Sequence, residues 1–234
     1  MHIEKYEILP STKELAEQYI ISNKYNETFV ILAKTQTLGV GRKDNFWHSP
    51  RGGLWFSLVL KHISTQKSFT LFVGYCVLKA LNEITKNKFE IKWPNDIYLL
   101  NNKICGLICS QYERFGMTHI GVGINTNNEE TSNYASIKKK LNKSLDNSIY
   151  LSAIISNILE LLPVFEEKGL LLFENYYKEH DYLKNKKLTI ESGNTIYTGL
   201  YKGIGKDGSL LIEQNSKIEH VYSGTVTAIS NRHT

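Results

Sequence analysis

The sequence predicts an α+β fold, with a mixed sheet flanked by helices and then a small antiparallel barrel of the SH3-like kind. Over residues 1–185, apolar runs of strand length alternate with longer amphipathic runs, as in strands and helices that share one core. Residues 186–234 instead hold short alternating runs separated by glycine-containing turns. With 41% apolar and 22% charged residues, the 234-residue chain has the composition of an ordinary soluble globular protein.

The elements of the first domain follow from periodicity and from capping residues. A strand over Ile3–Leu9 precedes Ser11 and Thr12. One of these two caps a helix over Lys13–Ser22, because its oxygen can accept a hydrogen bond from an unpaired backbone N–H. The further strands expected are Thr28–Ala33, Leu54–Leu60, Glu90–Trp93, Ile97–Leu100, Lys103–Gln111 and Met117–Ile124, the last one closing the sheet. The further helices expected are Ser68–Thr85, Ala135–Leu141, Tyr150–Phe165 and Leu170–Tyr182.

The composition changes after Asp181, and we place a domain boundary near residue 185. Residues 1–185 form the larger domain and residues 186–234 the barrel. The barrel strands expected are Leu188–Ile190, Thr195–Tyr197, Leu200–Ile204, Leu210–Ile212 and Val226–Ile229.

Charge and cysteine content exclude some classes of function. The net charge is +5, from 28 basic and 23 acidic residues, which suits anionic substrates but is too small an excess to predict DNA binding. Cys76, Cys105 and Cys109 are odd in number and form no Cys-x-x-Cys pair, so buried free thiols are expected. The N-terminus lacks a hydrophobic signal region, and no apolar stretch is expected to reach membrane-spanning length. A cytoplasmic protein is predicted.

A long segment without periodicity, Thr35 to Ser57, joins two of the expected strands. Irregular loops of this length in compact domains are usually functional. Gly39 and Gly41 let the backbone approach a ligand, and Arg42 supplies a planar fork for phosphate or carboxylate. Glycines between strands are also ordinary turn residues. By itself, the segment therefore predicts only an anion site.

Three further motifs combine polar side chains with close backbone approach. Lys-Trp-Pro-Asn-Asp at 92–96 places an aromatic beside two hydrogen-bonding groups at a turn, because proline cannot continue an interior strand. Lys-Ile-Cys-Gly-Leu-Ile at 103–108 has a glycine inside a strand, which indicates approach by a ligand or by another backbone. Gly-Val-Gly-Ile-Asn at 121–125 ends a strand in the same way.

Taken in order along the chain, these motifs resemble the biotin protein ligase family. Gln-Thr-x-Gly-x-Gly-Arg at 36–42, followed by Trp-x-Ser-Pro-x-Gly-Gly-Leu-Trp-x-Ser at 47–57, is similar to that family's biotin-binding loop. Lys-Trp-Pro-Asn-Asp matches the family motif without a mismatch. The resemblance implies a class II aminoacyl-tRNA synthetase-like catalytic domain, of the biotin-lipoate ligase type, with an SH3-like barrel. Because the pattern starts at Ser11, it implies the monofunctional type without an N-terminal DNA-binding domain.

The resemblance also implies roles for individual residues. Catalytic roles fall to Arg42, Lys103 and Asp96. Biotin contacts are expected from Ser11, Thr12, Gln36, Gly39, Arg42, Lys103, Gly106 and Gly121. ATP contacts are expected from Gly41, Arg42, Trp47, Asn95, Lys103 and Asn125. No metal ligands are assigned to the protein, because Mg²⁺ would be held mainly by phosphate oxygens.

The implied reaction joins biotin to a lysine in two steps. Biotin and ATP give biotinyl-5′-AMP and pyrophosphate, and a specific lysine of a biotin carboxyl carrier protein is then acylated. Two anions meet in the first step, so Arg42, Lys103 and Mg²⁺ would neutralise charge there. Asp96 would position the acceptor amine or accept its proton, and Thr126 to Ile137 would close over the adenylate. DNA and membranes are not expected as partners; a homodimer is common in the family.

The chain departs from the family pattern within the long loop. Val40 stands where the first arginine is usual, and Asp44 and Asn45 stand where a further Gly-Arg is usual. The loop thus has fewer cations, and we expect either weaker retention of the adenylate or a charge supplied by Lys43 or Arg51. Lys13 stands where an asparagine often follows the Ser-Thr pair.

Three other functions fit parts of the sequence. Lipoate or octanoyl ligases share the fold and the acyl-adenylate logic, but their arginine-rich and Gly-Gly-Gly signatures are absent. A small-molecule-binding module without turnover is suggested only by Val40 and Asn45. An SH3-like partner-binding protein would explain only the last fifth of the chain.

Overall fold

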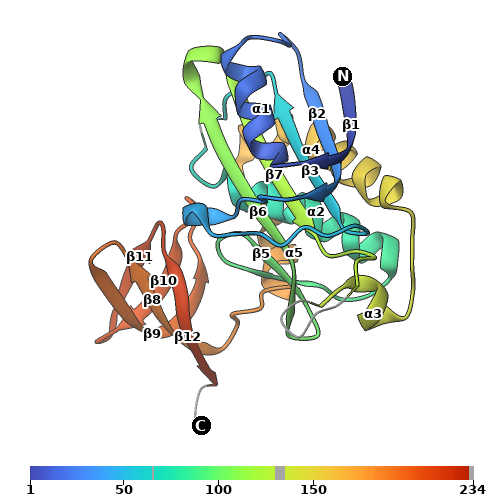
Figure 1. Ribbon diagram of the computed structural model, residues 1–234. Helices are drawn as coiled ribbons and strands as arrows, with labels where there is room; N and C mark the ends of the chain where they lie inside the picture. Colours follow the sequence, from blue (N-terminus) through green and yellow to red (C-terminus); the bar gives the residue numbers. More distant parts are fainter. Residues whose placement is uncertain (65, 130–134, 232–234) are drawn as a thin grey trace.

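The computed structural model describes residues 1–64, 66–129 and 135–231, and it confirms the α+β fold (Figure 1). The larger sheet has the strand order β1-β2-β3-β7-β6-β5-β4. Neighbouring strands are antiparallel, except that β1 and β2 are parallel. Its strands are β1 His2–Leu9, β2 Phe29–Gln36, β3 Leu54–Leu60, β4 Glu90–Lys92, β5 Asp96–Leu99, β6 Asn102–Tyr112 and β7 Met117–Ile124.

Strand β7 lies in the middle of this sheet, so the prediction that it closes the sheet is wrong. It pairs with β3 on one side and with β6 on the other. Six of its eight residues are buried, as expected for a strand covered on both faces. The centre of the sheet thereby brings the ends of β3, β6 and β7 together beneath the loop that follows β2.

Helices cover both faces of the sheet and create two cores. Helix α2 (Phe69–Thr85) and helix α4 (Asn147–Lys168) pack on one face, where they form the main apolar cluster with β3, β6 and β7. Helix α1 (Thr12–Ile21) covers the other face through Ala16 and Ile20. As expected, Ser11 caps α1, its Oγ accepting from the Glu14 N–H.

The segment after α4 differs from the expected helix over Leu170–Tyr182. A short 3-10 helix, η3 (Gly169–Phe173), leads into α5, which covers only Glu174–Glu179. Gly169 adopts a φ of 63°, which interrupts the regular α-helix. The remaining short elements are η1 Arg42–Asp44, η2 Glu113–Phe115 and α3 Ile137–Leu141.

The expectation that no apolar stretch reaches membrane-spanning length is also wrong. Residues 147–179 form one helical run that is long and apolar enough to cross a membrane by length and composition, with a mean hydropathy of 1.6 in an 18-residue window. The sequence predicted two separate helices here, Tyr150–Phe165 and Leu170–Tyr182, and neither of them is that long. However, Ile154, Ile158 and Phe165 are buried in the core shared with α2. These three residues of α4 therefore serve packing, whereas Ile149 and Leu159 are exposed, and a single helix of this kind is weak evidence for a membrane span.

The C-terminal sheet curls beside the main body, as the orange and red strands in Figure 1 show. It consists of β8 Lys186–Ser192, β9 Thr195–Ile204, β10 Leu210–Gln214, β11 Lys217–Val221 and β12 Thr225–Asn231, in the order β11-β10-β9-β8-β12. Strand β9 unites two predicted strands. Strand β11 was not predicted, because four of its five residues are exposed and carry little apolar signal.

Hydrogen bonds join the barrel to the sheet edge formed by β4 and β5. The Trp93 indole donates to the Gly208 carbonyl over 3.1 Å, and the Tyr201 hydroxyl donates to Asp181 over 2.6 Å. The Arg42 side chain donates to the Gly224 carbonyl over 3.4 Å, so the segment between β11 and β12 lies next to the long loop of the first domain.

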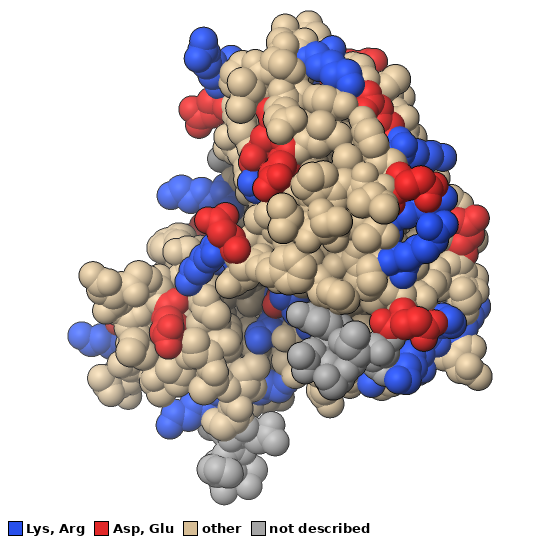
Figure 2. Space-filling model, viewed as in Figure 1, with Lys and Arg blue, Asp and Glu red and all other residues tan. Residues whose placement is uncertain are grey.

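Charged side chains form no extended patch of one sign on the face drawn in Figure 2. Blue and red side chains alternate around its rim, and most of its centre carries neither. This distribution agrees with the modest net charge of +5.

Candidate active site

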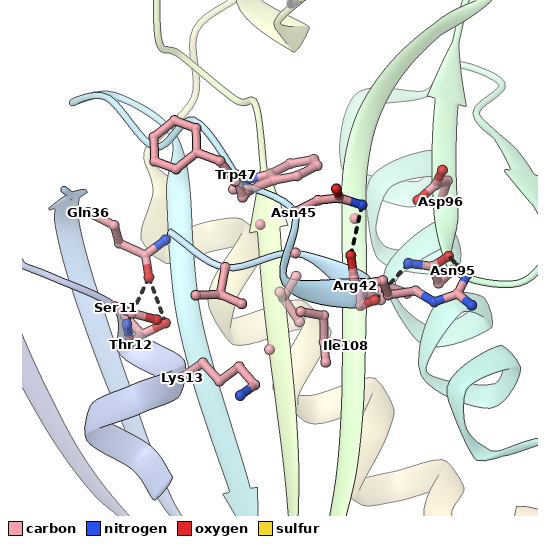
Figure 3. Close-up of a pocket in the computed structure, with 18 of the residues that line it drawn as sticks. Ser11, Thr12, Lys13, Gln36, Arg42, Asn45, Trp47, Asn95, Asp96 and Ile108 are labelled. Atoms are coloured by element: carbon pink, nitrogen blue, oxygen red, sulfur yellow. Dashed lines mark hydrogen bonds between the residues drawn. The ribbon is translucent and has the colours of Figure 1, made fainter. Parts of the chain in front are cut away.

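One cavity of about 350 Å³ collects most of the residues singled out in the sequence (Figure 3). Its volume is that of a small-molecule site. The predicted residues that line it are Ser11, Thr12, Gln36, Gly41, Arg42, Trp47, Asn95, Asp96, Lys103, Gly106 and Gly121. They come from the start of α1, the end of β2, the long loop, and strands β5, β6 and β7, so parts of the chain that are distant in sequence build one site.

Two predicted residues, Gly39 and Asn125, do not line the cavity. Gly39 supports its wall: a Cβ there would lie 2.3 Å from the Trp47 carbonyl oxygen, so only glycine fits. Asn125 is buried at the end of β7 and accepts a hydrogen bond from the Asn128 side chain over 3.1 Å. Its position orders the turn after β7.

At one end of the cavity, Ser11, Thr12 and Gln36 form what we call the amide end. The Gln36 Oε1 atom accepts from the Thr12 backbone N–H over 2.8 Å and from the Thr12 hydroxyl over 3.0 Å. The Gln36 Nε2 atom donates to Ser49 Oγ over 2.8 Å, which fixes the orientation of the amide. These bonds leave one amide hydrogen of Gln36 unused.

The loop after β2 folds into a narrow hairpin over the cavity. Its backbone closes through Trp47 N–H to Gly39 carbonyl at 2.7 Å and Gly41 N–H to Asn45 carbonyl at 2.6 Å. At its tip, Lys43 and Asp44 adopt φ values of 54° and 56°. The hairpin carries Arg42 toward the centre of the molecule.

Trp47 covers the sheet where two glycines make room for its ring. A Cβ at Gly123 would lie 2.5 Å from Trp47 Nε1, and one at Gly106 would lie 3.0 Å from the ring edge. The buried indole N–H has no hydrogen-bond partner among the described residues. Lys103 Nζ lies 5.1 Å from the ring centre, within cation–π range.

At the opposite end, Arg42, Asn95, Asp96 and Lys103 form what we call the charged end. Arg42 donates to Asn95 Oδ1 over 3.0 Å, and Lys103 Nζ lies 2.8 Å from Asp96 Oδ1. Burial lowers the pKa of Arg42, and the nearby Asp96 charge opposes this shift. An arginine pKa starts so high that Arg42 stays protonated at neutral pH. This end can therefore hold phosphate and carboxylate groups.

Several residues that line the cavity were not expected at the site from the sequence. Three of them lie on the same strands or segment as predicted site residues: Phe56, Leu107 and Gly123. Lys13 follows the Ser-Thr pair, and its Nζ atom lies 2.6 Å from Glu17. Thr225 carries no sequence signal, because it belongs to the barrel.

Of the two cations expected to replace the missing arginine, the structure places only Lys43 in the cavity wall. Lys43 Nζ donates to Thr225 Oγ1 over 3.1 Å. Arg51 instead extends away from the cavity, where it lies 3.4 Å from Glu7.

The site has a charged end and the hydrogen-bonding amide end, where the nearby Lys13 is paired with Glu17, and an apolar wall joins the two ends. Among the described residues, no group of three or more His, Cys, Asp or Glu side chains could hold a metal ion. Asp96 is the only carboxylate among the described lining residues. The arrangement fits a ligand with a polar, uncharged head and an anionic reacting group.

Two family models match the chain. The model of the biotin/lipoate A/B protein ligase family matches residues 6–127. The model of the biotin protein ligase C-terminal domain matches residues 185–227. Together they include the sheet, most of the cavity and the barrel.

Known proteins resemble the chain over nearly its whole length. The bifunctional ligase/repressor BirA of Bacillus subtilis is 29% identical over 96% of this chain and 73% of that protein. The structure of the biotin protein ligase from Aquifex aeolicus in complex with biotin and ATP superposes with a TM-score of 0.86, with 25% identity over 98% of this chain and 99% of that one. Biotin acetyl coenzyme A carboxylase synthetase from Helicobacter pylori shares the fold at 22% identity, 94% coverage of this chain and 99% of that one, and a TM-score of 0.72.

Proposed function

The chain belongs to the biotin/lipoate A/B protein ligase family, and from this membership we infer that it is an ATP-dependent biotin–protein ligase. It activates biotin with ATP to biotinyl-5′-AMP and transfers the biotinyl group to a lysine of a biotin carboxyl carrier protein. The observation that carries this conclusion is a single cavity that joins Arg42 and Lys103 to an uncharged amide end. The match to the biotin protein ligase C-terminal domain favours biotin over lipoate.

Biotin binds with its ureido ring at the amide end. A ureido group offers one carbonyl acceptor and two N–H donors. The unused amide hydrogen of Gln36 suits the carbonyl, and the hydroxyl oxygens of Ser11 and Thr12 suit the N–H groups. Gly106 and Gly121 leave room for the ring and the tail, which runs toward Arg42.

The nucleotide binds at the charged end, beneath the hairpin. Trp47, Gly41 and Asn95 border the space for the adenylate, and Asn125 acts by ordering the turn after β7. Lys103 Nζ lies 5.1 Å from the Trp47 ring centre and 2.8 Å from Asp96, so its cation borders the same space as these two residues. Asn125 is thus a supporting residue in this proposal, with no direct nucleotide contact in its present position.

In the first step, a biotin carboxylate oxygen bonds to the α-phosphorus of ATP, and the bond to pyrophosphate breaks. Arg42 and Lys103 hold both anions and neutralise the charge that develops on the phosphoryl oxygens. Since Asp96 is the only carboxylate among the described lining residues, Mg²⁺ would be held mainly by phosphate oxygens, where it would neutralise pyrophosphate.

In the second step, the neutral amine of the acceptor lysine attacks the biotinyl carbonyl, and AMP leaves. A free lysine has a pKa of about 10.4, so the amine has to lose a proton near neutral pH. Asp96 can take that proton or hold the amine in line once Lys103 turns to the phosphate.

The proposal also covers the domain bounds, the acceptor protein, the location in the cell and the oligomeric state. Residues 1–185 form the catalytic domain and residues 186–234 the SH3-like barrel, with β8 beginning at Lys186. The acceptor is a biotin carboxyl carrier protein in the cytoplasm, and neither DNA nor a membrane takes part. A homodimer is compatible with this activity, which needs one cavity per chain.

Incubation with biotin, MgATP and a biotin carrier domain tests the proposal. Mass spectrometry should show one biotinyl group added to the carrier by the parent chain, and far less by Arg42→Ala. Lipoate in place of biotin should give no product. No transfer by the parent chain, or equal transfer of lipoate, would overturn the proposed function.

A further inference from the structure

His119 is a buried titratable residue that the mechanism above does not use. It lies on β7 and is fully buried, opposite Val59 of β3 and Ser110 of β6. Its Nε2 atom is 2.9 Å from the Ser57 hydroxyl oxygen. Its Nδ1 atom has no hydrogen-bond partner among the described residues. A Cβ at the cavity-lining Gly121 would lie 3.1 Å from its Cε1 atom, so His119 lies directly beneath the cavity wall.

A chain of hydrogen bonds connects His119 to the amide end. Ser57 Oγ is 3.1 Å from Thr12 Oγ1, and Thr12 Oγ1 is 3.0 Å from Gln36 Oε1. Beyond Gln36, the chain continues through Ser49 Oγ to the Trp47 carbonyl over 2.8 and 3.0 Å. It therefore runs from the core of the sheet to the hairpin that carries Arg42.

Hydrogen counting fixes which atom donates in each hydrogen bond between His119 and Gln36. The Thr12 backbone N–H donates to Gln36 Oε1, so the amide oxygen faces Thr12. A carbonyl oxygen has no hydrogen, so the Thr12 hydroxyl must donate to Gln36. Its only hydrogen is then used, and Ser57 must donate to Thr12. For the same reason His119 must donate to Ser57, as the neutral imidazole with its hydrogen on Nε2.

We propose that His119, acting through Ser57, is a positioning residue that holds the Thr12 hydroxyl and the Gln36 amide in the orientation that reads the ureido group of biotin. The proposal rests on the proposed function. The His119, Ser57 and Thr12 side chains all donate in the direction of Gln36, so each of these bonds strengthens the next and makes the unused Gln36 N–H a better donor to the ureido carbonyl. Thr12 keeps one lone pair to accept a ureido N–H.

The surroundings keep the imidazole neutral. Burial lowers the pKa of His119 to about 4; the Glu17 charge opposes this shift and the Lys13 charge adds to it. Glu17 is itself paired with Lys13 on the same helix and accepts a hydrogen bond from the Tyr112 hydroxyl of β6. A protonated ring would add an N–H at Nδ1 with no acceptor, so the donor pattern is stable at neutral pH.

Binding of biotin and of ATP to the separate variants tests this role. His119→Leu removes the donor, while His119→Gln places an amide N–H near the Nε2 position. Calorimetry should show biotin binding about three- to tenfold weaker in His119→Leu, with the affinity for ATP unchanged and with biotin affinity restored in His119→Gln. In a Ser57→Ala background, His119→Leu should cause no further loss.

Val59→Ala is the matched control, because Val59 lies opposite His119 in the sheet and its side chain takes no part in the hydrogen bonds from His119 to Gln36. It should lower stability and leave biotin affinity unchanged. Unchanged biotin affinity in His119→Leu, or equal weakening of biotin and ATP binding, would overturn the inference while leaving the ligase assignment intact. Absence of biotin binding by the parent chain would instead overturn the proposed function and the inference with it.

Discussion

The two ends of the cavity are built in different ways. Around the amide end, Thr12 is 4% exposed and Ser57 fully buried, and regular elements hold both residues. At the charged end, the Lys103 side chain is 39% exposed, and Arg42 and Lys43 lie on a hairpin that contacts the barrel. Rigid elements suit the recognition of ligand shape, whereas loops suit groups that must rearrange between two steps. The comparison predicts that changes at the amide end alter binding and that changes at the charged end alter turnover.

Lys103→Ala should have the largest effect, because it removes a cation where two anions meet. We expect the rate of biotinyl-AMP formation to fall about 10²- to 10³-fold, with a much smaller loss of biotin affinity measured without ATP. Rapid-quench assays of the first step give the rate. Lys202→Ala breaks an ion pair of 2.9 Å on the barrel and should leave the rate unchanged. A loss in Lys103→Ala confined to biotin affinity would contradict the division of the cavity.

Asp96→Ala separates the two steps. Transfer of biotin from preformed biotinyl-AMP to a carrier domain should slow about 10²-fold, because the amine loses its proton acceptor. Formation of biotinyl-AMP should slow less. Single-turnover kinetics of each half-reaction make the comparison, and equal losses in both would refute the role given to Asp96.

The neutral state of His119 predicts a pH effect on stability. Its folded pKa of about 4 lies below the ordinary value of 6.5, so the unfolded chain binds more protons between these values and stability falls as the pH falls. Asp181, whose pKa burial raises to about 6, has the opposite effect in the same range. The prediction therefore concerns the difference between the parent and His119→Gln, in which the Asp181 contribution cancels.

Denaturant unfolding of both proteins measures that difference. Relative to His119→Gln, the parent should lose about 2 kcal/mol between pH 7 and pH 5. A difference that does not change with pH would mean that folding leaves the pKa of His119 unchanged, and it would contradict the prediction.

Thr12→Val tests the amide end directly. Removal of the hydroxyl leaves Ser57 without an acceptor and the ligand without a partner, so biotin affinity should fall about tenfold, with kcat at saturating biotin nearly unchanged. Thr85→Val removes a hydroxyl that donates to the Leu81 carbonyl far from the cavity, and it serves as the control. A fall in kcat equal to the fall in affinity would contradict the assignment.

Thr225→Ala should have the smallest effect. Lys43 loses an exposed hydrogen bond of 3.1 Å, and we expect KM for ATP to rise about two- to threefold. Thr198→Ala, at an exposed barrel site, is the control. A larger effect would mean that the barrel contributes to nucleotide binding more directly than through Lys43.

The sequence predicted the charged end better than the amide end. Arg42, Asp96 and Lys103 lie in motifs that resemble those of the family, and the resemblance implied a role for each of them. Thr12 and Gln36 were expected near biotin. The hydrogen bonds that reach them from His119 through Ser57 could not be predicted, because these two residues meet only through the pairing of β3 with β7. An isolated histidine in an apolar strand gives the same signal as an ordinary core residue.

The contacts between the long loop and the barrel could not be predicted from the sequence either. Lys43 and Thr225 are separated by 182 residues, and no periodicity indicates that they meet. The position of β7 was predicted wrongly because strand order depends on which edges pair, which local pattern does not record. The residue types at the site could therefore be predicted from local sequence, whereas strand order and contacts between distant segments could not.

Biotin-dependent exchange of labelled pyrophosphate into ATP tests the central claim most directly, because it reports the first step alone at this cavity. We predict exchange by the parent chain with biotin, none with lipoate, and a loss of about 10²- to 10³-fold in Arg42→Ala. Absence of biotin-dependent exchange by the parent chain, or full exchange by Arg42→Ala, would contradict the account.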